Sequence, residues 1–502
     1  MDSEPSEELN FWEWLLNPNA FPIIHDHLRQ YLNVAELLSL SLTSKKLEPI
    51  RHYTLKKAAN IDALLKDYVQ NAQLFRSYLR DANALISGSF ALNVFEMGRL
   101  KVRKMDIFVE DGPMADHFML LLDVWEQYES QTEQDDEQDD ESLLTPSQLP
   151  RTFKFTSKER KGLELRVTRT PGPPVQHIMT SSPTTACVNF VSANKAYSIF
   201  PRPTFIQRQL APLRSLDDEL NARLKKLRQH GWSSRDVLWP GHHGGHGTLP
   251  QFTGLRRVGD SSTLIIQLDP ITQFRIMRFP ESAIDYSQFN IAMFDPVDSR
   301  ADWSAQNRLP PTSLQNMIPP TAFIKVEGEA VRSPALRHSI VASDPVWESY
   351  LRGQLNFWAW NEWYWLDADK RPEQDPDAVP FSSELVVPEN FAFPASWDHA
   401  DYEVPHWYRE WKEGRMMIGK PTSILRRCIV FAPASPWSFP RLEKKPTPSI
   451  ENKCRIICPT HTPDSCSSLQ HRRAQLIGCA YGIRSKRRAR TRQLIRDESH
   501  HV

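Results

Sequence analysis

"ALISGSFALNVFEMGRLKVRKMDIFVE" (residues 84–110) is the stretch of the chain that indicates its fold. It opens with a short apolar run that predicts a buried strand, followed by the turn residues Gly88 and Ser89. A helix is expected through Phe90 to Phe95, and MDIFVE (residues 105–110) predicts a second strand. A strand, a Gly-Ser turn, a helix and an acidic strand together predict an α/β domain in this part of the chain.

This order of elements is typical of the start of the nucleotidyltransferase fold, in which each residue type has a chemical purpose. The glycine lets a triphosphate approach the backbone, and the helix N-terminus offers free N–H groups. Carboxylates at positions i and i+2 lie on one face of the strand, with their roots about 7 Å apart. There they can share two Mg²⁺ ions that hold the attacking and leaving oxygens. Gly88, Ser89 and Asp106 are therefore the candidate residues for nucleotide and metal.

Lys104 stands where the first of the two carboxylates would be. Its ammonium offers no oxygen ligand, and we expect it to pair with Asp106 instead. Glu110 shares the strand face but lies about 13 Å further along the strand. Glu164, in LELRV, is the only candidate for a third carboxylate. The sequence therefore predicts no catalytic residue and no cofactor, whereas an active enzyme would need Asp106, Glu164 and Mg²⁺.

Residues 21–50 predict a group of short helices. Asn33 followed by Glu36 matches an N-cap and capping-box pair, so a new helix should begin there. About thirty residues bury too little surface to be stable alone, so some apolar side chains should contact a partner or the following domain. The expected anchors in a partner's groove are Leu28, Leu32, Leu37 and Leu38. The alternative is a helical cap that packs on residues 53–80 without any partner.

Three stretches of the chain resemble a group of functionally uncharacterised fungal proteins that join an F-box-like N-terminus to a degenerate nucleotidyltransferase-like domain. The stretches are LISGSFAL…MDIFV, CVNFVSANKAYSIFPRPTFIQRQ and LRRVGDSSTLIIQLD, and the similarity spans roughly residues 20–270. The resemblance implies that residues 21–50 dock the Skp-type adaptor of an SCF ubiquitin ligase. In that family the acidic strand commonly contains Ser-Asp-x-Asp-Ile-Phe. Gly88, Ser89 and Asp106 match the family, whereas Lys104 departs from it.

The chain divides by composition into five parts. We expect a flexible acidic N-terminus (1–18), the F-box-like module (19–52), an α/β domain (53–290), a partly packed Pro- and Trp-rich region (291–414) and a basic, disordered tail (415–502). The α/β domain should contain an acidic loop at 129–145, helices over 61–79, 118–125 and 215–229 and near 184–200, and strands over 152–157, 163–169 and 263–269. The predicted class is α+β, with a long irregular C-terminal region.

Some further segments have both a functional and a neutral interpretation. Two sets of residues are of the types that bind metal, but their surroundings do not suit a metal site. One set is His242, His243 and His246 in a Gly-rich loop, and the other is Cys454, Cys458, His461 and Cys466 near the C-terminus. The aromatic run FWAWNEWYW (357–365) predicts either a buried segment, which we favour, or an interaction surface. The basic run RSKRRARTR (484–492) is typical of nuclear targeting or of a solvated tail.

The bulk composition gives little support for a nucleic-acid or membrane partner. Lys+Arg and Asp+Glu both number 61, so the formal net charge is zero. No apolar stretch approaches the roughly 18 residues of a membrane span, and the acidic start differs from a secretory signal. Six Cys in 502 residues do not suggest a disulfide framework. We therefore expect an intracellular protein of the cytoplasm or the nucleus.

The sequence as a whole favours a non-catalytic protein that bridges a Skp-type adaptor and an unknown target protein. One alternative is a Mg²⁺-dependent nucleotidyltransferase that acts on RNA or protein. The other is an inert pseudoenzyme that binds nucleotide at Gly88, Ser89 and Lys104.

Overall fold

The computed structural model describes residues 20–28, 30–131, 150–157, 162–234, 253–271, 281–294, 323–374, 379–388, 391–394 and 396–416. Several segments that the sequence singles out lie outside these ranges. They are the acidic N-terminus at 1–18, the acidic run at 133–141, the His-rich loop at 242–246, the Cys/His set at 454–466 and the basic run at 484–492.

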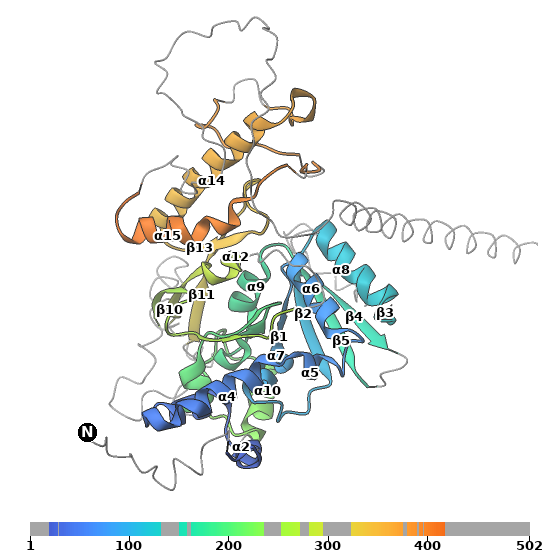
Figure 1. The fold of residues 1–502 in the computed structure, drawn as a ribbon, viewed down its shortest axis with the longest axis vertical. Helices are drawn as coiled ribbons and strands as arrows, with labels where there is room; N and C mark the ends of the chain where they lie inside the picture. The colour runs from blue at the N-terminus through green and yellow to red at the C-terminus, as the bar shows by residue number, and fades with distance from the viewer. Residues whose placement is uncertain are drawn as a thin grey trace, which may run out of the picture. The chain divides into compact units, whose positions relative to one another are not determined.

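A mixed eight-stranded sheet forms the centre of the α/β part, in the order β3-β4-β5-β2-β1-β6-β7-β9 (Figure 1). β2 and β5 run parallel, and each of the other neighbouring pairs is antiparallel. Helices and a mixed sheet confirm the predicted α+β class. The strands are β1 (Leu85–Ser87), β2 (Lys104–Glu110), β3 (Tyr128–Gln131), β4 (Arg151–Ser157), β5 (Glu164–Thr170), β6 (Asn189–Val191), β7 (Lys195–Ser198) and β9 (Leu264–Gln267).

β2 presents alternate side chains to two different cores. Met105, Ile107 and Val109 are buried in the core that several helices cover. Those helices are α6 (Ala72–Asp81), α7 (Gly88–Phe95), α8 (Pro113–Val124) and α10 (Asp218–Gln229). Phe108 packs against the other core, which includes α9 (Pro174–Ser181). Because side chains alternate along a strand, Asp106 lies on the same face as Phe108.

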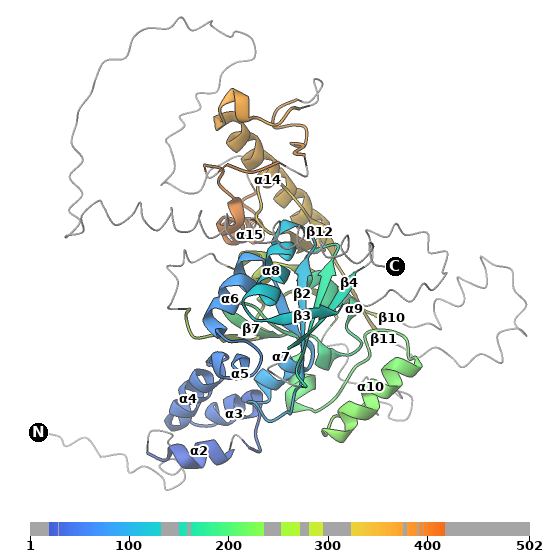
Figure 2. The ribbon, with the colours of Figure 1, turned by 90° about the vertical axis from the view of Figure 1, so that its right-hand side faces the viewer.

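The N-terminal helices pack onto the α/β part of the chain. They are α2 (Pro22–Leu28), α3 (Val34–Ser41), α4 (Glu48–Ala59) and α5 (Asp62–Leu65), drawn in blue below the sheet in Figure 2. The predicted capping box at the start of α3 is confirmed, since Asn33 accepts from the Glu36 N–H and Glu36 accepts from the Asn33 N–H. The Asn33 side-chain amide also donates to the Phe205 carbonyl at 3.0 Å. Val34 and Ala35 are buried in the main core.

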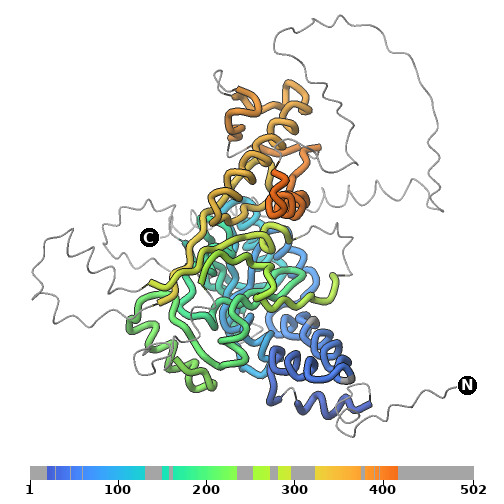
Figure 3. Tube along the Cα trace, turned by 90° about the vertical axis from the view of Figure 1, so that its left-hand side faces the viewer, coloured from blue at the N-terminus to red at the C-terminus, as the bar shows by residue number. Residues whose placement is uncertain are grey.

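Residues beyond β9 form further regular elements, and Figure 3 follows them from yellow to orange. They are α12 (Ser282–Asp285), β10 (Gln288–Phe294), β11 (Phe323–Glu327), β12 (Glu329–Val331), β13 (Ile340–Ala342), α14 (Pro345–Trp365) and α15 (Val404–Lys412). One more strand, β8 (Gly254–Arg257), comes just before β9 in the chain. β10 pairs with both β8 and β11. The boundary that composition placed at residues 290 and 291 therefore falls inside a strand, and the described residues belong to one compact unit.

Two of the expected helices differ from what the structure shows. The helix expected over 61–79 is divided into α5 and α6, because Asn71 caps a new helix by accepting from the Leu74 N–H at 3.0 Å. The segment near 184–200 has one short 3-10 helix, at Thr185–Cys187, followed by a β-hairpin of β6 and β7 in place of the expected longer helix. The Ser192 hydroxyl oxygen accepts from the Lys195 N–H at 3.0 Å and closes the hairpin turn. The other expected helices and strands are confirmed within a few residues, as α8, α10, β4, β5 and β9.

Candidate functional site

The turn between β1 and α7 brings Gly88 against Asp106 of β2. Gly88 has φ +69°, a conformation that side chains rarely adopt. A Cβ atom on Gly88 would lie 2.6 Å from Asp106 Oδ2. The sequence assigns this glycine to the approach of a triphosphate. In the structure, the group that lies close to the Gly88 backbone is the carboxylate of Asp106. Ser89, the next residue, is exposed.

The parallel pairing of β2 and β5 places a second cation at Asp106. Lys104 lies opposite Glu164 in the register, and Asp106 lies opposite Arg166. Arg166 donates from Nε to Asp106 Oδ1 at 2.7 Å. Lys104 Nζ lies 3.7 Å from the same oxygen, which is the ion pair expected from the sequence. One carboxylate oxygen therefore faces two fixed cations, and the other faces Gly88.

Glu164 does not add a free carboxylate to this site. Its Oε1 lies 3.8 Å from Arg166 Nε, so Arg166 stands between the two acids. The remaining acid on this face of β2, Glu110, accepts from the Ser339 hydroxyl at 3.0 Å and lies 3.4 Å from Arg332. These carboxylates are each beside a cation or a hydroxyl of another element.

The protonation of Asp106 depends on opposing effects. The pKa of the Asp106 carboxyl is raised from its ordinary 3.8 to about 7; burial is the largest cause, Arg223 of α10 acts in the opposite direction, and Glu164 adds to the rise. The ion pair with Arg166 also favours the carboxylate. Arg223 itself pairs with Glu219 at 2.9 Å. The site thus gathers Lys104, Arg166 and Arg223 around one half-buried acid.

This arrangement does not fit a pair of magnesium ions. Mg²⁺ requires oxygen ligands in near-octahedral geometry, and the clamp on a phosphoryl group needs two such ions. Here Lys104 and Arg166 both form ion pairs with Asp106 Oδ1, an oxygen that metal ions would need as a ligand. Among the described residues, no group of three or more His, Cys, Asp or Glu side chains could hold a metal. The geometry describes an ion-pair cluster that joins β2, β5 and α7.

The predicted anchors of the N-terminal helices are less exposed than a docking surface requires. Leu37 is only 1% exposed, so a partner cannot reach it. Leu28, Leu32 and Leu38 are half-buried, and Leu38 packs against the main core. The exposed apolar side chains in this part of the chain are others: Ile23, Tyr31 and Leu42.

The aromatic run at 357–365 forms the last part of α14 and is largely packed. Trp360 is 2% exposed, and its indole N–H donates to the Ser383 carbonyl at 2.7 Å. Trp358 donates to the Asp398 carbonyl at 2.8 Å. Tyr364 and Trp365, at the end of the helix, are exposed. The buried interpretation therefore holds for most of the run, and its last two residues face outward.

Sequence reasoning missed Arg166 and Arg223. Arg166 follows Glu164 at the i+2 position, so it shares the face of β5 that turns toward Asp106. That spacing could have identified it once β2 and β5 were taken as parallel neighbours. Arg223 lies more than a hundred residues from Asp106 in the sequence, and no local pattern connects the two.

No protein-family model matches the chain, and no curated protein or solved structure matches it. No helix in the described ranges combines the length and the apolar character that a membrane span requires.

Proposed function

We propose that this protein is a non-catalytic adaptor. Its N-terminal helices dock the Skp-type adaptor of an SCF ubiquitin ligase, and its nucleotidyltransferase-like α/β domain, together with the α14 region, binds a target protein. The observation that carries the proposal is the exposure of three large apolar side chains among the N-terminal helices. The first lies in α2, the second follows α2, and the third follows α3. Ile23 is 72% exposed, Tyr31 is 73% exposed and Leu42 is 76% exposed. Large apolar groups that remain in water are stabilised when a partner's groove covers them.

The attachment of α3 to the core supports this proposal. Asn33 bonds to Phe205, and Arg99 donates to the Tyr31 carbonyl at 2.8 Å. These polar contacts hold the start of α3 in place, while Ile23, Tyr31 and Leu42 remain exposed. A rigid surface loses less conformational entropy on binding than a flexible one, so less of the interaction energy is lost.

A pull-down with purified Skp-type adaptor tests the proposal. Ile23→Asp and Leu42→Asp each place a charge at one of these exposed apolar positions, and each should remove the chain from the adaptor beads. The matched control is Val124→Asp, because Val124 on α8 is 56% exposed and apolar but far from α2 in the sequence. The wild type and the control should be retained. Absence of binding by the wild type, or equal retention of all four proteins, would show that these helices are a cap and not a docking module.

The alternative function is enzymatic nucleotidyl transfer, and it can be tested at Asp106. Incubation with labelled nucleoside triphosphates and Mg²⁺ should give no labelled product, because Arg166 and Lys104 occupy the carboxylate that would bind metal. Labelling by the wild type that Asp106→Ala abolishes would establish a nucleotidyltransferase. Nucleotide binding without transfer is also disfavoured, since the Asp106 carboxylate lies where a phosphate would approach Gly88.

A further inference from the structure

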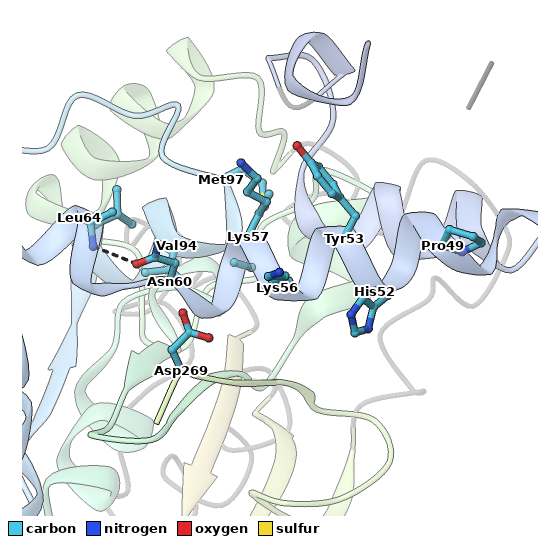
Figure 4. Close-up of a pocket in the computed structure, with 12 residues that line it drawn as sticks. Pro49, His52, Tyr53, Lys56, Lys57, Asn60, Leu64, Val94, Met97 and Asp269 are labelled. Carbon is cyan, nitrogen blue, oxygen red and sulfur yellow. Dashed lines mark hydrogen bonds between the residues drawn. The ribbon is translucent and has the colours of Figure 1, made fainter. Parts of the chain in front are cut away.

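A cavity of about 750 Å³ lies between the N-terminal helices and the α/β core (Figure 4). Its lining comes from α4, α5, α7 and the segment that follows β9. Sites for small molecules commonly enclose about 300–1,000 Å³. Neither the Asp106 cluster nor the exposed apolar residues of α2 and α3 contribute to the cavity. It is therefore a separate feature of the molecule that the sequence did not reveal.

The polar part of the lining is rich in hydrogen-bond donors. Lys57 lies 3.9 Å from Asp26 and 5.4 Å from the centre of the Tyr53 ring. Lys56 and His52 make no hydrogen bond or ion pair with the described residues. Figure 4 shows His52 and Lys56 on the side of α4 that faces Asp269, the one acid among the described lining residues. No ion pair joins Lys56 to Asp269 in the described part of the chain, so the ammonium of Lys56 is available to a ligand.

The apolar part of the lining lies next to these donors. Val94 of α7 is 2% exposed, and Leu64 and Met97 pack against the main core. Since these side chains are fixed by the core, the cavity has an apolar wall beside a charged edge. A charge–charge contact near an apolar wall is stronger than one in bulk water, because the local dielectric constant is lower.

We propose that this cavity binds a small organic anion, whose apolar body lies against Leu64, Val94 and Met97 and whose phosphate or carboxylate group binds the ammonium of Lys56. Asn60, at the C-terminal end of α4, supplies a second donor from its side-chain amide. Asp269 accepts from a hydroxyl or amino group of the ligand. The site is independent of the adaptor function proposed above, because it shares no residue with the exposed surface of α2 and α3.

A fluorescence titration of the full chain with anilinonaphthalene sulfonate, an amphipathic anion, tests the proposal. The wild type should bind the probe at a saturable site. Lys56→Met removes the charge of an exposed side chain without disturbing the core, and it should weaken binding about tenfold, as the loss of one charge-assisted contact does. Lys56→Arg should keep most of the affinity. The matched control is Lys225→Met, because Lys225 is an exposed lysine on α10 outside the cavity.

Competition then distinguishes the two head groups. Displacement of the probe by adenosine monophosphate and not by octanoate supports a phosphate ligand, and the reverse supports a carboxylate ligand. An affinity that is the same in the wild type, Lys56→Met and Lys225→Met would overturn the proposal, because the probe would then bind elsewhere. Loss of adaptor binding with an intact probe site would affect only the function proposed above.

Discussion

The carboxylate of Asp106 packs against Gly88 and leaves no room for a larger residue at this position. Its φ of +69° already disfavours a side chain, and an added Cβ would lie 2.6 Å from Asp106 Oδ2. We expect Gly88→Ala to lower the free energy of unfolding by about 2–4 kcal/mol, as the sum of backbone strain and overpacking. Chemical denaturation of the wild type and the variant measures the difference.

The double variant Gly88→Ala/Asp106→Ala separates these two causes. Removing the carboxylate relieves the clash but leaves the backbone strain, so the double variant should lose less stability than the two single changes added together. The coupling free energy should be about 1–2 kcal/mol. Strictly additive losses would mean that Asp106 moves aside without cost, and that the glycine is needed for its backbone alone.

Asp106 also gives the molecule a characteristic dependence on pH. Its pKa in the folded protein is raised from 3.8 to about 7, mainly by burial. The native state therefore binds the proton more tightly than the unfolded chain, and the stability that this provides is lost as the pH rises from about 4 to 7. Asp106→Asn cannot titrate, so its stability relative to the wild type should increase over this range by up to about 1.4 kcal/mol per pH unit. Urea denaturation at a series of pH values measures the slope.

The ion pair with Arg166 decides how large this effect is. The guanidinium lies 2.7 Å from the carboxylate and favours its charged form. If the stability difference between Asp106→Asn and the wild type is constant over the range, the carboxylate is ionised throughout and the ion pair outweighs burial. Such a result would strengthen the view of the site as a fixed ion-pair cluster.

At the level of elements, the start of α3 joins the N-terminal helices to the core. Asn33 caps α3 through Glu36 and also donates to the Phe205 carbonyl, and it is fully buried. We expect Asn33→Ala to lower the free energy of unfolding by about 2–3 kcal/mol, because it removes a cap and leaves a buried carbonyl without this donor. Thermal or urea denaturation measures the loss.

Glu36→Gln is the matched control for this change. Glutamine can also accept from the Asn33 N–H, so the capping box should survive and the loss should be well under that of Asn33→Ala. If both variants lose the same stability, the charge of Glu36 dominates, and the bond from Asn33 to Phe205 contributes little. Limited proteolysis near residue 33 would show whether the helices detach locally.

The elements that the sequence predicted are those whose signal lies within a few neighbouring residues. The capping box of α3 is contained in residues 33–36, and α10 begins at a capping aspartate, Asp217. The sequence predicts a helix near the hairpin at 189–198, because the two strands are short and apolar, and such runs have no distinct period. Arg166 was missed because its position depends on which strands are neighbours. The pairing of β10 with β11 crosses a long stretch of chain and has no local signal at all.

The whole molecule depends on contacts between elements far apart in the sequence. The segment before β13 meets the segment before α15, where Asp401 accepts from the backbone N–H groups of Arg337 and His338 at 2.8 and 3.3 Å. Ser282 of α12 donates to the Asp401 carbonyl. Asp401 thus connects three parts of the chain. Protonation of a histidine beside Asp401 would therefore affect the contacts among all three parts of the chain.

His338 and His399, beside this junction, should make the molecule sensitive to acid. The pKa of His338 is lowered from 6.5 to about 3 by burial, by Arg337 and by His399, and that of His399 is lowered to about 4 by burial and Arg337. The unfolded chain then binds protons more readily, so stability is full above pH 6.5 and falls as the pH decreases. His338→Gln should reduce this slope by up to about 1.4 kcal/mol per pH unit between pH 6 and pH 4, as measured by urea denaturation. Parallel curves for the variant and the wild type would mean that His338 takes up its proton at the same pH in the folded and unfolded chain, and the acid sensitivity would then have to come from other groups.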